Sequence, residues 1–148
     1  MSGENLHGET VSFPAAFKTN NCTVVIVAYA RKQQEIIDPW LPELGGLARS
    51  IKGFEFYELP TIKEMNRVMR WIIHNGMRSG VKDAAARSRT VTLHIDKAPF
   101  NRALGVSDES TIHLLVLDRN GRELHRETGA YEKSKFARIK KVVHATPR

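Results

Sequence analysis

The stretch that decides the fold is CTVVIVAYARKQQEIIDPWL, which spans Cys22–Leu41. It opens with a mostly β-branched apolar run, Thr23–Tyr29, which is typical of a strand buried on both faces of a sheet. A short polar loop follows, and apolar residues then recur at helical spacing. This spacing predicts a helix from about Glu35 to Ser50, and Pro42 should bend this helix or delay its true start. Strand, loop and helix form the first half of a βαβ unit, whose loop usually carries the ligand site of an open α/β sheet.

The residues on either side of this unit predict two further strands and a helix. Val11 and Phe13 alternate with polar residues, which indicates a small edge strand or hairpin that feeds the central strand. FEFYEL, residues Phe54–Leu59, alternates as a strand does, and Pro60 is expected to end it. Thr61 with Glu64 three residues later is a capping box, which predicts a helix over 61–76.

The C-terminal half predicts a hairpin closed by a basic helix, preceded by a strand and a short helix. Asp118–Gly121 holds an Asn-Gly pair between two apolar runs, which is a strong signal for a hairpin turn. The predicted elements are strands over Thr90–Ile95, Thr111–Leu117 and Glu123–Thr128, and helices over 82–86, Lys97–Leu104 and Glu132–His144.

Composition limits the classes of protein to consider. The chain has 148 residues, 41% hydrophobic and 26% charged, which predicts one globular domain over 1–148 with its core at about 6–143. No apolar run reaches the roughly 18 residues of a membrane span, and no signal peptide is visible. A cytoplasmic location is therefore expected, or a periplasmic or mitochondrial one if a targeting segment was removed. The net charge of +7 favours acidic partners.

The order of elements predicts an α/β fold with a mixed sheet, helices on both faces, and a C-terminal hairpin and helix. Three stretches resemble thioredoxin-like redoxins: the LHGETV entry at Leu6–Val11, the central strand, and the hairpin at Ile112–Leu124. Gly129 and the final helix are similar to the closing element of that fold. The chain is therefore identified as a thioredoxin-like domain, and the resemblance covers roughly Leu6 to Val143.

Within that superfamily the layout is most similar to the thioredoxin-like assembly factors of the mitochondrial ATP synthase membrane sector and their bacterial relatives. The matching features are Trp40 in the first helix, the YELP strand exit at Tyr57–Pro60, and LVLDRNG at Leu115–Gly121. This resemblance implies an assembly factor or chaperone that acts by protein binding. Its expected partner is an acidic protein surface or a subunit of a membrane complex.

Redox-active members of the superfamily carry a Cys-x-x-Cys motif where this chain has Arg31–Glu35, and a cis-proline where it has Ser110. The only cysteine is Cys22, so a dithiol mechanism cannot be built. We therefore expect a redox-inactive domain with no catalytic residue and no cofactor. The alternative is a one-cysteine thiol or peroxide oxidoreductase that uses Cys22. Its position at the start of the strand, away from the usual site, favours an inert thiol.

Other candidate sites follow from charge and spacing. Arg31, Lys32, Gln33 and Gln34 follow the central strand near a helix N-terminus and could bind an anion or a partner; a solvated loop is the simpler interpretation. His94 and His113 lie on strands that we expect to be neighbours, but ordinary sheet residues are favoured and no metal site is predicted. The basic C-terminal helix offers nucleic-acid binding as a third hypothesis. Trp40 and Trp71 are expected in the core.

Overall fold

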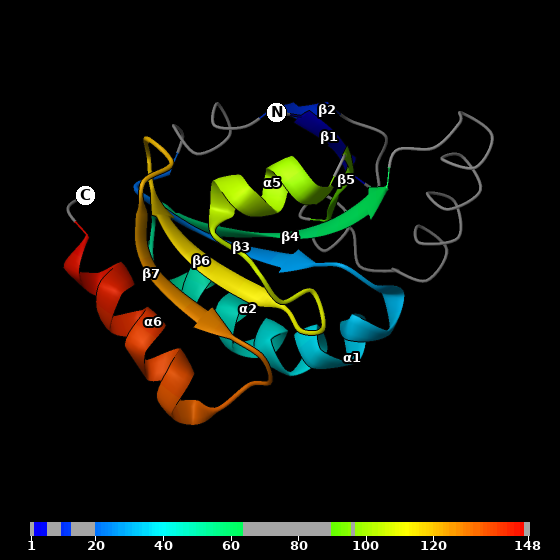
Figure 1. Ribbon diagram of the computed structural model, residues 1–148. Coiled ribbons are helices and arrows are strands. Elements are labelled where there is room, and N and C mark those ends of the chain that lie inside the picture. The colour runs from blue at the N-terminus through cyan, green and yellow to red at the C-terminus, as the bar shows by residue number, and fades with distance from the viewer. Residues whose placement is uncertain (1, 6–9, 13–19, 64–89, 96, 147–148) are drawn as a thin grey trace.

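The computed structural model describes residues 2–5, 10–12, 20–63, 90–95 and 97–146. Within this part of the chain the strands form one seven-stranded mixed sheet, in the order β2-β1-β5-β4-β3-β6-β7 (Figure 1). The strands are β1 (Ser2–Asn5), β2 (Thr10–Ser12), β3 (Cys22–Ala28), β4 (Phe54–Lys63), β5 (Val91–Ile95), β6 (His113–Asp118) and β7 (Glu123–Thr128). The helices are α1 (Gln34–Ile37), α2 (Leu41–Ser50), α5 (Lys97–Leu104) and α6 (Lys133–Ala145), with 3₁₀ turns at Arg31–Gln33 and Asp38–Trp40.

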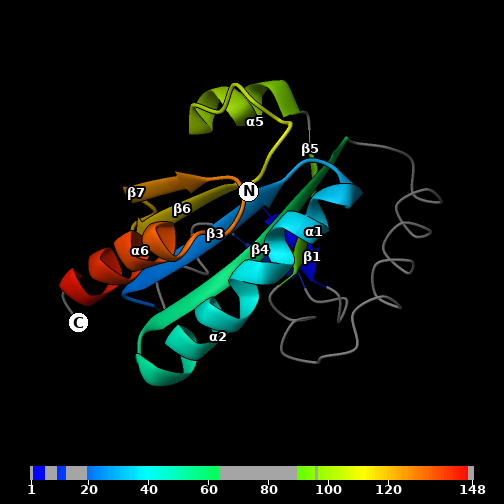
Figure 2. The same ribbon diagram turned by 90° about the horizontal axis from the view of Figure 1, so that it is seen from below.

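β3 is the central strand, as the sequence predicts. It pairs in parallel with β4 and antiparallel with β6, and each of its residues is buried. Helices cover both faces: α5 lies on one side of the sheet, and α1, α2 and α6 lie on the other (Figures 1 and 2). The predicted mixed sheet with helices on both faces is therefore confirmed. None of the described helices has the length and apolar character to cross a bilayer.

The alternation of β3 divides the core into two layers. Val24 and Ile26 point toward α2 and α6, where they pack with the core residues of those helices, whereas Val25 and Val27 point toward α5. The first layer includes Trp40, Leu44, Leu47, Phe54, Phe56, Phe136, Ile139 and Val143, and the second includes Tyr29, Leu59, Val91, Val106, Leu115 and Leu117.

The predicted end of β4 is wrong. The strand continues past Pro60 to Lys63, so Thr61 is not a helix cap. The backbone of Thr61 pairs with Leu93 of β5, and the Thr61 hydroxyl donates to the carbonyl of Ala28 at 3.1 Å. Pro60 is tolerated because it stands opposite Ala28, where the pairing with β3 ends and pairing with β5 takes over. The rest of the predicted helix over 61–76, which includes Trp71, and the predicted helix over 82–86 lie outside the described residues.

The predicted first helix is confirmed as a helical segment, but it is interrupted. The 3₁₀ turn at Asp38–Trp40 separates α1 from α2, and Pro39 and Pro42 each lie in the first positions of the element they enter. A proline fits there because the missing N–H would have no partner within the helix. The interruption turns Trp40 fully into the core.

The C-terminal hairpin and helix are also confirmed. In the turn, the carboxylate of Asp118 accepts the backbone N–H groups of Asn120 and Arg122, both at 2.9 Å. Gly121 has φ 83°, and among the described residues every positive φ belongs to glycine, so Asn120 does not adopt the left-handed conformation. The pairing of β6 with β7 shifts between Val116 and Leu117, which leaves Leu124 as the extra residue of a β-bulge in β7.

One charged cluster joins β7 to α6. Glu127 is 8% exposed, its Oε1 lies 2.5 Å from the Arg138 Nε, and the His125 Nε2 lies 3.5 Å from that same oxygen. Burial raises the pKa of Glu127, but the hydrogen bond and charge of Arg138, together with His125, outweigh burial and hold the pKa below its usual value. This contact stabilises the packing of α6 on the edge of the sheet.

We therefore expect the stability of the protein to depend on Glu127 in acid. A carboxyl group with a lowered folded-state pKa contributes stability that is present above its unfolded-state pKa and is lost as the pH falls through the folded value. The free energy of unfolding of the wild type should consequently fall more steeply below about pH 4.5 than that of Glu127→Gln. Urea denaturation at a series of pH values measures both slopes, and equal slopes would contradict this role of Glu127.

Candidate functional site

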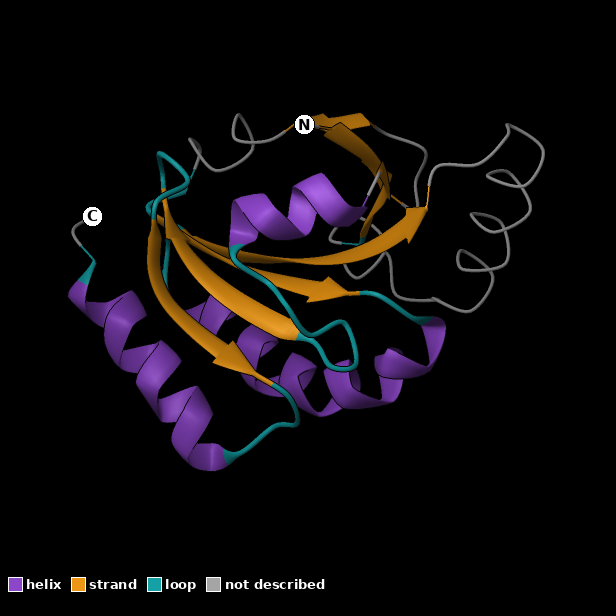
Figure 3. Cartoon of the chain, viewed as in Figure 1, coloured by secondary structure: helices purple, strands orange, loops and turns teal. Residues whose placement is uncertain are grey.

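The loop at the carboxyl end of β3 is fixed by the side chain of Gln33. This side chain is 2% exposed. Its Oε1 accepts the backbone N–H of Tyr29 at 2.7 Å and that of Ala30 at 3.3 Å, and its Nε2 donates to the carbonyl of Glu109 at 2.7 Å. A single amide therefore joins the loop after β3 to the loop before β6, which lie side by side in Figure 3.

A polar cluster lies behind this loop, on the α5 side of the sheet. The hydroxyl of Tyr29 donates to the Oδ1 of Asn101 on α5 at 2.8 Å. Burial, together with the negative charge of Glu109, raises the pKa of Tyr29 to about 12, which keeps the phenol neutral. The ring of His113 meets that of Tyr29 edge to face, with the centroids 6.1 Å apart.

The environment of His113 fixes its tautomer. Its Nε2 lies 2.6 Å from the carbonyl oxygen of Asp108, and because a carbonyl only accepts, the Nε2 carries the proton. Its Nδ1 is buried and has no hydrogen-bond partner among the described residues. The hydroxyl and backbone N–H of Ser110 both donate to the carboxylate of Asp108 and lower the pKa of Asp108. The loop before β6 is therefore held by local hydrogen bonds among Asp108, Ser110 and His113.

The four residues proposed for anion or partner binding have different environments. Gln33 is buried in its network, whereas Lys32 is exposed. The Nε2 of Gln34 donates to Asp38 at 2.8 Å and to the buried Glu58 at 3.2 Å. The side chain of Arg31 lies outside the described ones. An anion would therefore meet carboxylates on the helical side of this loop, and anion binding here stays a prediction.

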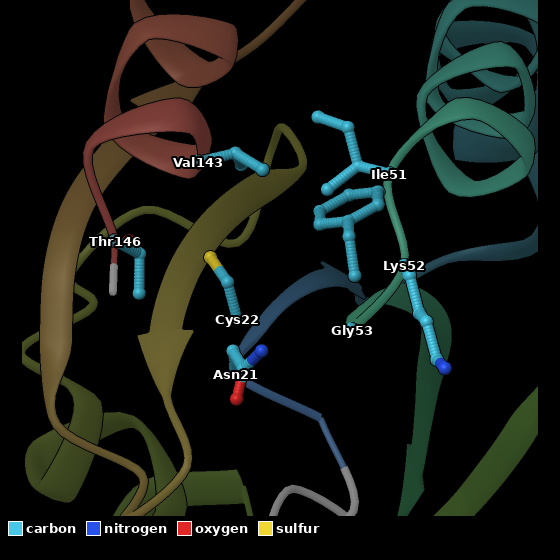
Figure 4. Close-up of a pocket in the computed structure, with 8 residues that line it drawn as sticks. Asn21, Cys22, Ile51, Lys52, Gly53, Val143 and Thr146 are labelled. Atoms are coloured by element: carbon cyan, nitrogen blue, oxygen red, sulfur yellow. The ribbon is translucent and has the colours of Figure 1, made fainter. Parts of the chain in front are cut away.

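Cys22 lies at the other end of β3, as expected. Its side chain is buried beside a small hollow of about 10 Å³, which has room for one water molecule. Figure 4 shows its sulfur directed toward Val143 and Thr146 at the end of α6. Burial raises the pKa of the Cys22 thiol, which a hydrogen bond with Thr146 only partly offsets. The thiolate is therefore disfavoured at neutral pH.

The expected pairing of His94 and His113 is wrong. β5 and β6 are separated in the sheet by β4 and β3. His94 stands opposite Ile62 of β4, and His113 stands opposite Val27 of β3. Long-range crossovers place the two strands apart, although they are adjacent in sequence. Within the described part of the chain, no three His, Cys, Asp or Glu side chains are grouped as metal ligands.

Sequence reasoning named Gln33 only as one of four loop residues and missed its role. The signal is absent from the local sequence, because its partner Glu109 is 76 residues away. Asn101 and Glu58 were missed for the same reason. The resulting arrangement can position two loops, and the described residues at this end include no thiol.

Solved structures match this chain over nearly its whole length. The thioredoxin domain of a thiol-disulfide oxidoreductase from Bacteroides vulgatus has a TM-score of 0.64 and 17% identity, covering 97% of this chain and 92% of that one. The exposed lipoprotein thioredoxin of Streptococcus pneumoniae has a TM-score of 0.65 and 12% identity, covering 97% and 98%. BsSco, a member of the Sco family of cytochrome c oxidase assembly proteins, has a TM-score of 0.61 and 7% identity, covering 98% and 92%.

Comparisons of the sequence, by contrast, found no match. No family model matches the chain, and no curated protein matches it. The finer resemblance to ATP synthase assembly factors therefore finds no support in these comparisons. Identities this low establish the fold alone. The arrangement of β4-β3-β6-β7 with α2, α5 and α6, together with these structural matches, shows that the chain has the thioredoxin-like fold.

Proposed function

We propose that this protein is a thioredoxin-like domain that acts by binding another protein and not by exchanging disulfides. The observation that carries the proposal is the Gln33 network. Where redox-active members of the superfamily have their dithiol, this chain has a buried amide whose oxygen and nitrogen are both hydrogen-bonded to loop backbone. Disulfide exchange needs an attacking thiolate, and an amide cannot supply one.

The finer part of the proposal is a role in assembling a membrane complex. An assembly role on this fold is named for BsSco. The sequence adds the resemblance of Trp40, Tyr57–Pro60 and Leu115–Gly121 to the ATP synthase assembly factors. Such a role requires a stable surface for a partner and no turnover. The hydrogen bonds that fix the loops around Gln33 and Asp108 are compatible with that requirement.

The alternative function is a one-cysteine oxidoreductase. A reactive cysteine needs solvent access and a lowered pKa. Cys22 is 2% exposed, and burial raises its pKa. It also lies at the opposite end of β3 from the Gln33 network. These observations favour an inert thiol, so this alternative serves as the outcome that would overturn the proposal.

Two turnover assays test the absence of thiol chemistry. We expect the wild type to reduce insulin disulfides with dithiothreitol, and to consume hydrogen peroxide, no faster than the buffer alone. Cys22→Ser should show the same background rate, because the buried thiol supplies little thiolate. A rate above background that Cys22→Ser abolishes would overturn the proposal and establish the oxidoreductase.

A cross-linking experiment tests the positive half of the proposal. The tagged full chain is cross-linked in a lysate of the source cell, and captured proteins are identified by mass spectrometry. We expect a discrete protein partner, still captured by Cys22→Ser and after nuclease treatment. Capture that disappears with nuclease would replace protein binding with nucleic-acid binding.

A further inference from the structure

Three segments converge at the amino end of β3, opposite the Gln33 network. The α2–β4 connection is held there because the backbone N–H of Asn21 donates to the carbonyl of Gly53 at 2.8 Å. The β6–β7 turn is held there because the guanidinium of Arg119 donates to the side-chain oxygen of Asn21. The last turn of α6 completes the group, since Thr146 lines the same small hollow as Lys52 and Gly53 (Figure 4).

These segments carry a concentration of positive charge, which we call the basic end. It is defined by five exposed cations, Lys52, Arg119, Arg122, Lys140 and Lys141, with the exposed His144 beside them. The described acidic residues nearby already have hydrogen-bond or ion-pair partners. Asp118 accepts two backbone N–H groups of its own turn, and Glu123 forms an ion pair with Arg126. Glu55 is half-buried on β4 and follows Phe54, so it points to the α5 side of the sheet.

The other end of the molecule has more exposed acid. Its exposed carboxylates are Glu35, Asp38, Asp108, Glu109 and Glu132. The described cations there are Lys32, Lys133 and Lys135, and Lys135 is paired with Glu132 at 3.1 Å. The charges of the described residues are thus distributed unevenly along the axis of β3. Such a field steers an acidic partner toward the basic end and away from the opposite end.

One apolar residue accompanies the cations. Leu124 follows the β6–β7 turn within the bulged part of β7 and is 40% exposed. Among the described residues, Leu124 is the one large hydrophobic side chain that is exposed. The described basic end has no exposed aromatic ring on which a nucleic-acid base could stack. Cations around a single aliphatic residue are better suited to an acidic protein segment that carries an apolar side chain.

We propose that the basic end is the docking surface for an acidic segment of the protein partner. This inference rests on the proposed protein-binding function and names the chemistry of its partner. Arg119 and Arg122 offer planar guanidinium groups that can bind carboxylates with two parallel hydrogen bonds, and the lysines add charge. Leu124 supplies a contact that does not depend on salt.

A pair of charge-matched variants tests the surface. The basic-end variant carries Arg122→Glu and Lys140→Glu, whose side chains form no hydrogen bond or ion pair with the described residues. The control variant carries Arg102→Glu and Lys133→Glu, which are also exposed but lie away from the basic end. Both variants lose the same net charge. Thermal melting first shows that each remains folded.

The probe is a fluorescent peptide of glutamate and aspartate with one central leucine, and anisotropy measures its Kd. We expect the basic-end variant to bind about tenfold or more weakly than the wild type at low salt, and the control variant to stay within about threefold. Leu124→Ser should weaken binding by about twofold to fivefold at both low and high salt, because it removes apolar contact and no charge.

Equal weakening of the two double variants would overturn the inference, since net charge alone would then explain binding. Preference for duplex DNA, or for vesicles containing phosphatidylserine, over the peptide would also overturn it and would identify the other class of acidic partner. None of these results changes the expected outcome of the insulin and peroxide assays. Turnover that depends on Cys22, or capture from the lysate that disappears with nuclease, would remove the proposed function itself.

Discussion

Trp40→Ala is expected to lower the free energy of unfolding by about 3–5 kcal/mol, which is the usual cost of truncating a fully buried aromatic residue to alanine. Trp40 has no exposed surface and lies in the core layer that α2 and α6 share. Its Nε1 donates to the carbonyl of Gly129 at 3.1 Å, and its ring meets Tyr131 edge to face with the centroids 5.3 Å apart. It thereby joins the α1–α2 connection to the loop that leads β7 into α6.

Trp40→Phe separates the two contributions of this side chain. Phenylalanine retains an aromatic ring in the core but removes the donor to Gly129. Its expected cost is about 1–3 kcal/mol, the range for a buried acceptor that loses its partner. Chemical denaturation followed by circular dichroism measures both variants without relying on tryptophan fluorescence. A cost below about 1.5 kcal/mol for Trp40→Ala would contradict this prediction. It would show that Trp40 contributes little to holding the α1–α2 connection against the loop between β7 and α6.

The elements that the sequence predicts well are those whose pattern is local. The β-branched run of β3 and the Asp118–Gly121 turn each carry their own signal. The same is true of the apolar spacing of α6. The end of β4 depends on a distant partner, because β5 continues the pairing after Pro60 passes the end of β3. A capping box at Thr61 and Glu64 is a valid local signal, and long-range pairing overrides it.

The candidate site was less predictable for the same reason. Position in the chain indicates the loop after β3 as a candidate site, and this stays a prediction. A glutamine in a polar loop, however, has no feature that distinguishes a buried amide from a solvated one. Tyr29 and Asn101 likewise meet only because α5 returns over the sheet, 72 residues later. Burial and hydrogen bonding of such residues depend on the assembled fold.

Gln33→Leu is expected to destabilise the protein by about 2–4 kcal/mol, because it removes an amide of similar size with both of its hydrogen-bonding groups. The N–H groups of Tyr29 and Ala30 lose an acceptor, and the carbonyl of Glu109 loses a donor. Gln33→Glu retains the acceptor and loses only the donor, although it introduces a buried negative charge. Gln34→Leu is the matched neighbour. Gln34 is exposed and Glu58 keeps the hydrogen bond from Thr90, so the loss of Gln34 should cost about 1 kcal/mol or less.

Hydrogen exchange distinguishes a local role of Gln33 from general destabilisation. Under conditions where each variant is fully folded, we expect Gln33→Leu to accelerate amide exchange of Ala30 and of the loop around Glu109. Exchange in α6 should change only by the global loss of stability. Uniform acceleration across the chain would mean that Gln33 contributes to packing alone. If the two loops exchange faster and the partner is still captured, the Gln33 network has a structural role, and the partner docks at the basic end. Loss of capture in Gln33→Leu, with the basic-end variant still binding, would place the partner on the loops that Gln33 joins.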